Sequence, residues 1–242
     1  MHPKTLALIA IPLLLLSACG KPTNAPATGS SSSSQASSGI PEKTTFMTKE
    51  ELETRAMKGD KEAQFSLGVM LLEGNMLPKN TAKGIEWLEK AANQGVMEAQ
   101  FNLGLTYLQG GDVPQDFEKA KTWLEKAAAQ GNDRSQYNLG IVYYQGLGTK
   151  VDYEKAMELF MESAKQGFSQ AQFNLGVMYA KGQGKLNAID AYAWFTLAAE
   201  RGDPQSISAL KDVDSRLSAE EKKIAAKRVE ELRREIVMPK VM

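Results

Sequence analysis

The chain of 242 residues contains one histidine and one cysteine, His2 and Cys19, and both stand near its N-terminus. Cys–His nucleophile pairs, Ser-His-Asp triads and Cys/His zinc sites need side chains that the rest of the chain does not offer. The formal net charge is zero, from 29 basic and 29 acidic residues, whereas nucleic acid is bound by a strongly basic face. The composition therefore predicts a protein that is not an enzyme, has no metal or cofactor, and does not bind nucleic acid.

Phosphate-binding loops are also missing. The glycine clusters at residues 110–111, 146–148 and 182–184 follow helical segments rather than strands, and none has the order G-x-x-x-x-G-K-[ST]. We interpret them as turns between helices.

The sequence has no apolar run long enough to form a stable transmembrane helix. The N-terminal run, residues 6–16, follows Lys4 and is shorter than the roughly 20 residues that span a bilayer. A short basic segment, an apolar segment of this length and the small residues Ser17 and Ala18 are typical of a secretory signal. We therefore assign residues 1–18 to a signal peptide.

The quartet Leu16-Ser17-Ala18-Cys19 at the end of this segment resembles the lipobox of bacterial lipoproteins. The resemblance implies cleavage before Cys19 and covalent lipid on that residue, and anchoring becomes stable once more than one acyl chain is present. Gly20 follows instead of aspartate, which in the enterobacterial sorting pattern implies the outer membrane, with the chain facing the periplasm. An ordinary signal peptide that happens to end at a cysteine is the alternative.

Residues 19–44 contain few large apolar side chains and include five consecutive serines at residues 30–34. A segment rich in Ser, Thr, Pro and Ala cannot bury enough apolar surface to offset the entropy of ordering it. We expect residues 19–44 to form a disordered tether that carries the lipidated cysteine. Residues 45–242 show no second break of this kind and are interpreted as one domain.

A repeat organises this domain. The hexads AQFSLG, AQFNLG, SQYNLG and AQFNLG begin at Ala63, Ala99, Ser135 and Ala171, each 36 residues after the one before. A fixed period of this size indicates a solenoid, in which each unit packs on its neighbours.

Each unit is predicted to be a pair of helices. In the second unit, apolar residues at helical spacing run from residue 99 to 110, a glycine-rich turn follows, and Asp116 is placed to start a second helix. This second helix ends at Gly131, and a closing glycine recurs at residues 59, 95, 167 and 202. Glycine suits that place because it adopts the left-handed conformation without steric cost.

The pattern A-x-x-x-L-G-x-x-Y, then G, then K-A-x-x-W-x-x-x-A-A-x-x-G resembles the Sel-one-like (Sel1-like) repeat, SLR, a relative of the tetratricopeptide repeat. The resemblance covers residues 63–202, with apolar departures at Leu71 and Leu159. It implies an all-α fold: a right-handed α-solenoid of antiparallel helix pairs, with about four 36-residue repeats plus a terminal half-repeat and capping helices. The tryptophans Trp87, Trp123 and Trp194 of the second helices are interpreted as core.

Both ends of the domain look like caps. Thr48 with Glu51 forms a capping box before a segment that aligns with the second helix of a unit. Ser218 with Glu221 forms another, which opens a helix through about Val237 with a one-sided apolar stripe. We expect this helix to cover the last repeat; the alternative is an amphipathic helix that docks on a membrane or a second protein.

In tetratricopeptide-like solenoids the first helices line the concave side, and the resemblance implies that this side binds a protein or peptide. The candidate partner-binding residues by matching position are Phe101, Leu105, Leu108, Tyr137, Ile141, Tyr144, Phe173, Val177 and Lys181. The alternative is that many of them only pack against the adjacent first helix. The polar positions beside them change from acidic toward neutral or basic along the array, which could set the direction of a partner.

The leading hypothesis is a lipid-anchored scaffold of the bacterial cell envelope that recruits another protein. The alternative is an immunity lipoprotein, which neutralises a secreted toxin of the phospholipase type. It is suggested by the resemblance to periplasmic lipoproteins that carry these repeats and neutralise toxins of this type. A weak hydrolase of the β-lactamase type is the third hypothesis. It is suggested by cysteine-rich members of the repeat family, whose paired cysteines are missing here.

Overall fold

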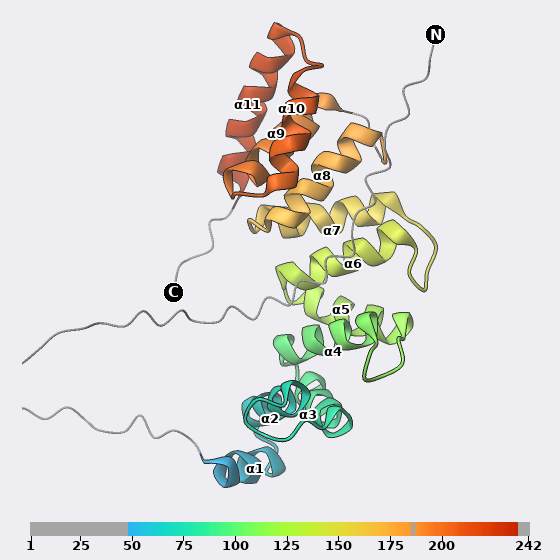
Figure 1. Ribbon diagram of the computed structural model, residues 1–242, viewed down its shortest axis with the longest axis vertical. Helices are drawn as coiled ribbons and strands as arrows, with labels where there is room; N and C mark the ends of the chain where they lie inside the picture. Colours follow the sequence, from blue (N-terminus) through green and yellow to red (C-terminus); the bar gives the residue numbers. More distant parts are fainter. Residues whose placement is uncertain (1–47, 185–186, 237–242) are drawn as a thin grey trace, which may run out of the picture. The chain divides into compact units, whose positions relative to one another are not determined.

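The computed structural model describes residues 48–184 and 187–236, and every regular element within them is an α-helix (Figure 1). The predicted signal peptide, the candidate lipidation residue Cys19 and the predicted tether lie outside the described residues. The helices are α1 (Lys49–Met57), α2 (Lys61–Glu73), α3 (Thr81–Asn93), α4 (Met97–Gln109), α5 (Phe117–Ala129), α6 (Asp133–Gln145), α7 (Tyr153–Lys165), α8 (Ser169–Lys181), α9 (Ala188–Glu200), α10 (Pro204–Asp214) and α11 (Ala219–Glu235).

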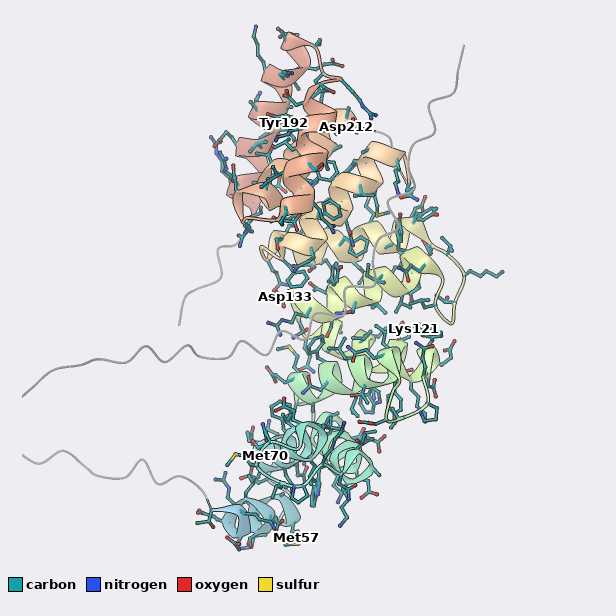
Figure 2. The ribbon with its side chains drawn as sticks, viewed as in Figure 1. Met57, Met70, Lys121, Asp133, Tyr192 and Asp212 are labelled. Atoms are coloured by element: carbon teal, nitrogen blue, oxygen red, sulfur yellow. The ribbon has the colours of Figure 1, made fainter. Side chains whose placement is uncertain are left out.

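The helices form consecutive pairs, shown with their side chains in Figure 2. α2 packs on α3, α4 on α5, α6 on α7 and α8 on α9, and each second helix also contacts the first helix of the next pair. The first helices α4 and α6 also contact each other. The prediction of an α-solenoid built from four helix pairs is therefore confirmed.

Local sequence sets where each helix begins and ends. Asp116 caps α5 as predicted, because its carboxylate accepts a hydrogen bond from the backbone N–H of Lys119 at 3.0 Å. The closing Gly131 has φ +90°, a conformation that strains any residue with a side chain, and the other closing glycines share it. α4 and α8 have the apolar N-cap residues Val96 and Phe168, which make no side-chain cap hydrogen bond.

The glycine of each hexad allows the two helices of a pair to approach closely. A methyl group added to Gly104 would lie 2.7 Å from Cγ of Leu124, and one added to Gly140 would lie 2.6 Å from the Phe160 ring. Carbon atoms do not approach that closely, so a larger residue would force α4 from α5 or α6 from α7.

Buried glutamines join each pair to the next. The Nε2 of Gln100 donates to the carbonyl of Ala92 at 2.9 Å, and its Oε1 accepts from Nε2 of Gln130 at 2.7 Å. Gln130 is the C-cap residue of α5, so this pair of side chains ties the start of one first helix to the ends of two second helices. Equivalent bonds recur around Gln64 and Gln136.

The glutamine pairing stops at the fourth repeat. Gln172 donates to the carbonyl of Ala164 at 3.2 Å, but its buried Oε1 has no partner among the described residues. The C-cap residue that follows is Arg201 instead of glutamine. An unpaired buried acceptor costs free energy, so this is a local weak point of the array.

The repeat pattern ends in α10. Its residue Lys211 stands nine positions after the closing Gly202, where the four repeats have glycine. A lysine at this position prevents a following helix from packing closely on α10, and α11 packs on α9 instead.

α11 forms the predicted cap. The capping box of Ser218 and Glu221 is confirmed, and the helix ends at Glu235, two residues before the predicted end. Its apolar stripe of Ala225, Val229 and Leu232 is 0–4% exposed and packs on α9. The expectation that this helix covers the last repeat is confirmed.

The tryptophans differ in burial according to what covers them. Trp194 is fully buried because Val229 and Leu232 of α11 pack in the same cluster, so the prediction of a core residue is confirmed there. Trp87 and Trp123 stand at the same place in their repeats but remain partly exposed.

Candidate binding surface

The predicted partner-binding residues lie on α4, α6 and α8, and three of them are in the core. Leu108, Ile141 and Phe173 are 2%, 6% and 8% exposed. Each joins a cluster of buried side chains, so a partner cannot reach it in this conformation. These three residues therefore pack between neighbouring helices, which was the alternative to partner binding.

Tyr137 and Tyr144 of α6 are half-buried in an aromatic cluster. The Tyr137 ring lies 5.8 Å from that of Phe160 and 5.1 Å from that of Phe168, and burial raises the pKa of its phenol. Tyr144 contacts the ring of Tyr153 at 5.4 Å, and its hydroxyl donates to Oε1 of Gln183 at 2.8 Å. These contacts hold α6 to α7 and to the turn after α8.

The remaining candidates keep accessible surface. Phe101, Leu105 and Val177 are half-buried, and Lys181 is exposed in the last turn of α8. Phe101 and Val177 also pack against the core, so only one side of each can meet a partner.

Exposed polar side chains flank these positions at both ends of the first helices. We call them the first-helix rim: Glu62, Glu73, Glu98, Gln109, Arg134 and Lys181. The rim changes from acidic in α2 to basic at the end of α8, as predicted from the sequence. It combines exposure with side chains that differ from one repeat to the next.

One polar group on the same helices is buried. Asn174 of α8 is 2% exposed, and its side chain lies beside the phenol of Tyr137 on α6. The same position holds Asn102 and Asn138 in the two preceding repeats, where the side chains are half-buried.

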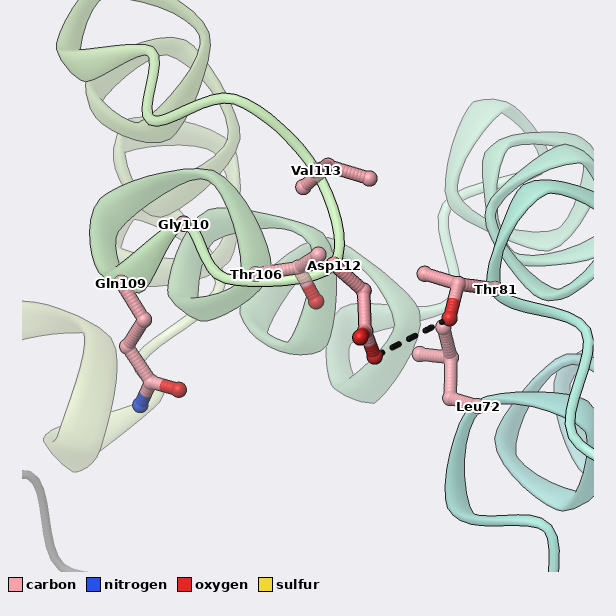
Figure 3. A pocket seen from close by; sticks show the side chains of 7 residues that line it. All are labelled: Leu72, Thr81, Thr106, Gln109, Gly110, Asp112 and Val113. Atoms are coloured by element: carbon pink, nitrogen blue, oxygen red, sulfur yellow. Dashed lines mark hydrogen bonds between the residues drawn. The ribbon is translucent and has the colours of Figure 1, made fainter.

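A small cavity lies where the turn after α4 meets the start of α3 (Figure 3). It measures about 170 Å³, and its lining mixes the apolar Leu72 and Val113 with the polar Thr81, Gln109 and Asp112. Asp112 accepts a hydrogen bond from Oγ1 of Thr81 at 3.2 Å.

The charge of Asp112 is already compensated. Asp112 pairs with Lys79, and the hydrogen bonds from Lys79 and Thr81 lower the pKa of its carboxyl. The carboxylate joins two adjacent repeats at this turn. The cavity has room for a small side chain of a partner.

Within residues 48–184 and 187–236, no cluster of three or more His, Cys, Asp or Glu side chains is arranged to hold a metal ion. In the same part of the chain, no helix is both long and apolar enough to cross a membrane.

The repeats that form this surface match a known protein family. A family model described as Sel1 repeat matches residues 61–96, 98–132, 133–168 and 169–203. The chain is similar to the crystal structure of a Sel1 repeat protein from Oxalobacter formigenes, with a TM-score of 0.60 and 29% identity over 66% of this chain and 64% of that one.

Two further structures are more distant. The chain is similar to c5321, a protective antigen of uropathogenic Escherichia coli with an SLR fold, with a TM-score of 0.50 and 27% identity over 77% of this chain and 48% of that one. The immunity protein PA5088 from Pseudomonas aeruginosa matches with a TM-score of 0.42 and 18% identity over 78% of this chain and 74% of that one, which is too distant to indicate function. No curated protein matches the chain. The chain spans less than two thirds of the first two structures.

Proposed function

Since the chain belongs to the Sel1 repeat family, whose members mediate protein–protein interactions, we propose that it is a non-enzymatic module that binds a partner protein or peptide along its first helices. The observation that carries this proposal is the contrast within those helices. Residues that build the helix pairs repeat from unit to unit and are buried, whereas the first-helix rim is exposed and changes in charge. Differences between repeats at exposed positions are what recognition of one particular partner requires.

The proposal includes a lipid anchor on Cys19 and a place in the bacterial cell envelope, at the outer membrane facing the periplasm. Its support is the quartet Leu16-Ser17-Ala18-Cys19 at the end of an apolar segment, followed by Gly20. In this account the covalent lipid is the only non-protein group, and residues 19–44 link it to the repeats. Growth with a labelled fatty acid tests the anchor: the chain should incorporate label, and the Cys19→Ala chain should not.

Charge reversal at the rim tests the binding proposal. The double variant Arg134→Glu and Lys181→Glu changes two exposed side chains on α6 and α8, so its unfolding temperature should match that of the unmodified chain. The variant should capture at least about tenfold less of the partner protein from an envelope extract than the unmodified chain does.

The control is Lys150→Glu with Lys155→Glu, which alters the charge equally at exposed positions outside the first helices. Equal retention by the rim variant and the unmodified chain would count against the proposal. If the retained protein is a secreted lipase-type toxin, and if cells with the chain survive that toxin, the immunity hypothesis accounts for the partner. Turnover of a β-lactam by the purified chain would instead support the hydrolase hypothesis.

A further inference from the structure

The outward side of the second helices α3 and α5 carries the same pattern twice. Each has a partly exposed tryptophan with one lysine four residues before it and another three residues after it. Because residues at this spacing share one side of a helix, each tryptophan stands between two lysines. We call this surface the tryptophan–lysine face; its residues are Lys83, Trp87, Lys90, Lys119, Trp123 and Lys126.

The two halves of the face are connected. Nζ of Lys90 lies 3.9 Å from the ring centroid of Trp87, and Nζ of Lys126 lies 4.1 Å from that of Trp123. Tyr107 of α4 stands between the helices: its hydroxyl lies 3.3 Å from Oε1 of Glu89 on α3, and its ring lies 5.0 Å from Nζ of Lys119 on α5. The face therefore continues from one repeat to the next.

The fourth repeat shows what such a surface accepts. There the equivalent residue, Trp194 of α9, is covered by α11. Nε of Arg228 on α11 lies 2.9 Å from Oδ1 of Asp190, which stands four residues before Trp194. Val229 and Leu232 supply the apolar contacts, so this chain already places an amphipathic helix on a tryptophan-bearing second helix.

The charge at the matching positions is reversed in the first two repeats. Where α9 has Asp190 facing Arg228, α3 has Lys83 and α5 has Lys119. Where α9 has the buried Leu197, the two helices have Lys90 and Lys126, which are exposed. A helix with arginine at the place of Arg228 would meet like charge here, whereas one with a carboxylate there would be matched.

We propose that the tryptophan–lysine face is a second binding surface, which accepts an amphipathic α-helix of a partner protein with acidic residues beside its apolar stripe. The apolar stripe covers the exposed part of Trp87 and Trp123, and the acidic residues pair with the lysines. This surface is separate from the first-helix rim, and the rim variant leaves it unchanged.

A peptide made from this chain tests the proposal. The probe is a fluorescent peptide of residues 219–236 with Arg228→Glu and Arg233→Glu, and the comparison peptide has the unaltered sequence. Fluorescence anisotropy measures binding of each to the full chain with Cys19→Ala, so that lipid plays no part. We expect the acidic peptide to bind at least about tenfold more tightly than the unaltered one, and to shift tryptophan emission to the blue.

Two matched variants of the full chain complete the test. Lys90→Glu with Lys126→Glu should weaken binding of the acidic peptide at least about tenfold. Lys58→Glu with Lys150→Glu makes the same change in net charge at exposed positions outside the second helices and should leave the affinity unchanged. No binding of the acidic peptide, or equal loss in both variants, would overturn the proposal. Binding of the full chain to phosphatidylglycerol vesicles that depends on Lys90 and Lys126, without peptide binding, would assign the face to a membrane instead.

Discussion

At the scale of single residues, the buried glutamines explain how the repeats are held in register. Gln64, Gln100 and Gln136 each bond to the end of the preceding second helix and accept a bond from the C-cap glutamine of their own repeat. Glutamine recurs at the second position of every hexad, but the pattern does not indicate that two side chains 30 residues apart would pair. Only the packing of three helices around one point brings them together.

The first prediction concerns the unpaired Oε1 of Gln172. In the third repeat, Nε2 of the C-cap residue Gln166 donates to Oε1 of Gln136 at 2.7 Å. Arg201→Gln should supply the equivalent donor to the unpaired Oε1 of Gln172. A new hydrogen bond to a buried acceptor should raise the free energy of unfolding by about 0.5–1.5 kcal/mol. Urea denaturation measures this change. Arg201→Ala is the control, because it removes the guanidinium without supplying a donor, and a gain of the same size in both variants would contradict the explanation.

The second prediction separates two uses of glycine. At Gly104 the neighbour Leu124 leaves no space for a side chain. Substitution by Ala should therefore lower the free energy of unfolding by about 1–3 kcal/mol, and substitution by the larger Asn should lower it further. At Gly131 nothing lies within 4 Å of an added Cβ, but φ is +90°. Asn tolerates this conformation better than Ala, so the order of the two substitutions should reverse there. Thermal unfolding of the four variants tests it; the same order at both positions would contradict this interpretation.

At the scale of elements, sequence periodicity predicts most of the fold. The first helix of the second repeat, predicted from residue 99 to 110, is found at Met97–Gln109, and its partner begins after Asp116 as predicted. Such features depend on neighbours within a few residues. The burial of Leu108, Ile141 and Phe173 depends on how closely helices of different repeats approach, and an apolar residue at helical spacing does not reveal that distance.

The sequence therefore distinguishes only in part which candidate binding residues are buried and which are accessible. Half-buried Phe101 and buried Phe173 occupy the same hexad position, and their burial differs because their neighbours in the adjacent repeats differ. The exposure of Trp123 has the same origin: it matches Trp194 in sequence, but α11 covers only Trp194. The charge change along the rim, in contrast, is directly readable, because the polar ends of these helices face solvent.

The third prediction concerns α11 as a cap. Leu232 is fully buried, and Leu232→Ala should lower the free energy of unfolding by about 2–4 kcal/mol, because it leaves a cavity beside Trp194. Ile224 on the same helix is 49% exposed, so Ile224→Ala should change stability by less than about 0.5 kcal/mol. Denaturation followed by tryptophan fluorescence measures both. Equal effects of the two substitutions would show that α11 does not cover the last repeat as described.

At the scale of the whole molecule, the residues that hold the repeats together are different from the exposed residues that we propose bind a partner. Each pair contacts mainly the next, so the closing glycines, hexad glycines and paired glutamines build an array in which exposed positions can vary without altering the fold. The two surfaces that we propose for binding, the first-helix rim and the tryptophan–lysine face, consist of such exposed positions. They lie on different helices, so one chain could hold two partners.

Site-specific photo-cross-linking can show whether a partner binds along the first helices, as we propose. A photoreactive residue is placed in cells at Gln109 or Arg134 on the rim, and at Glu154 or Glu158 on the exposed side of α7 as controls. We expect both rim positions to cross-link to the same partner protein, and neither control position to do so. Cross-links from the α7 positions alone, or none from the rim while the chain is intact in the envelope, would contradict it.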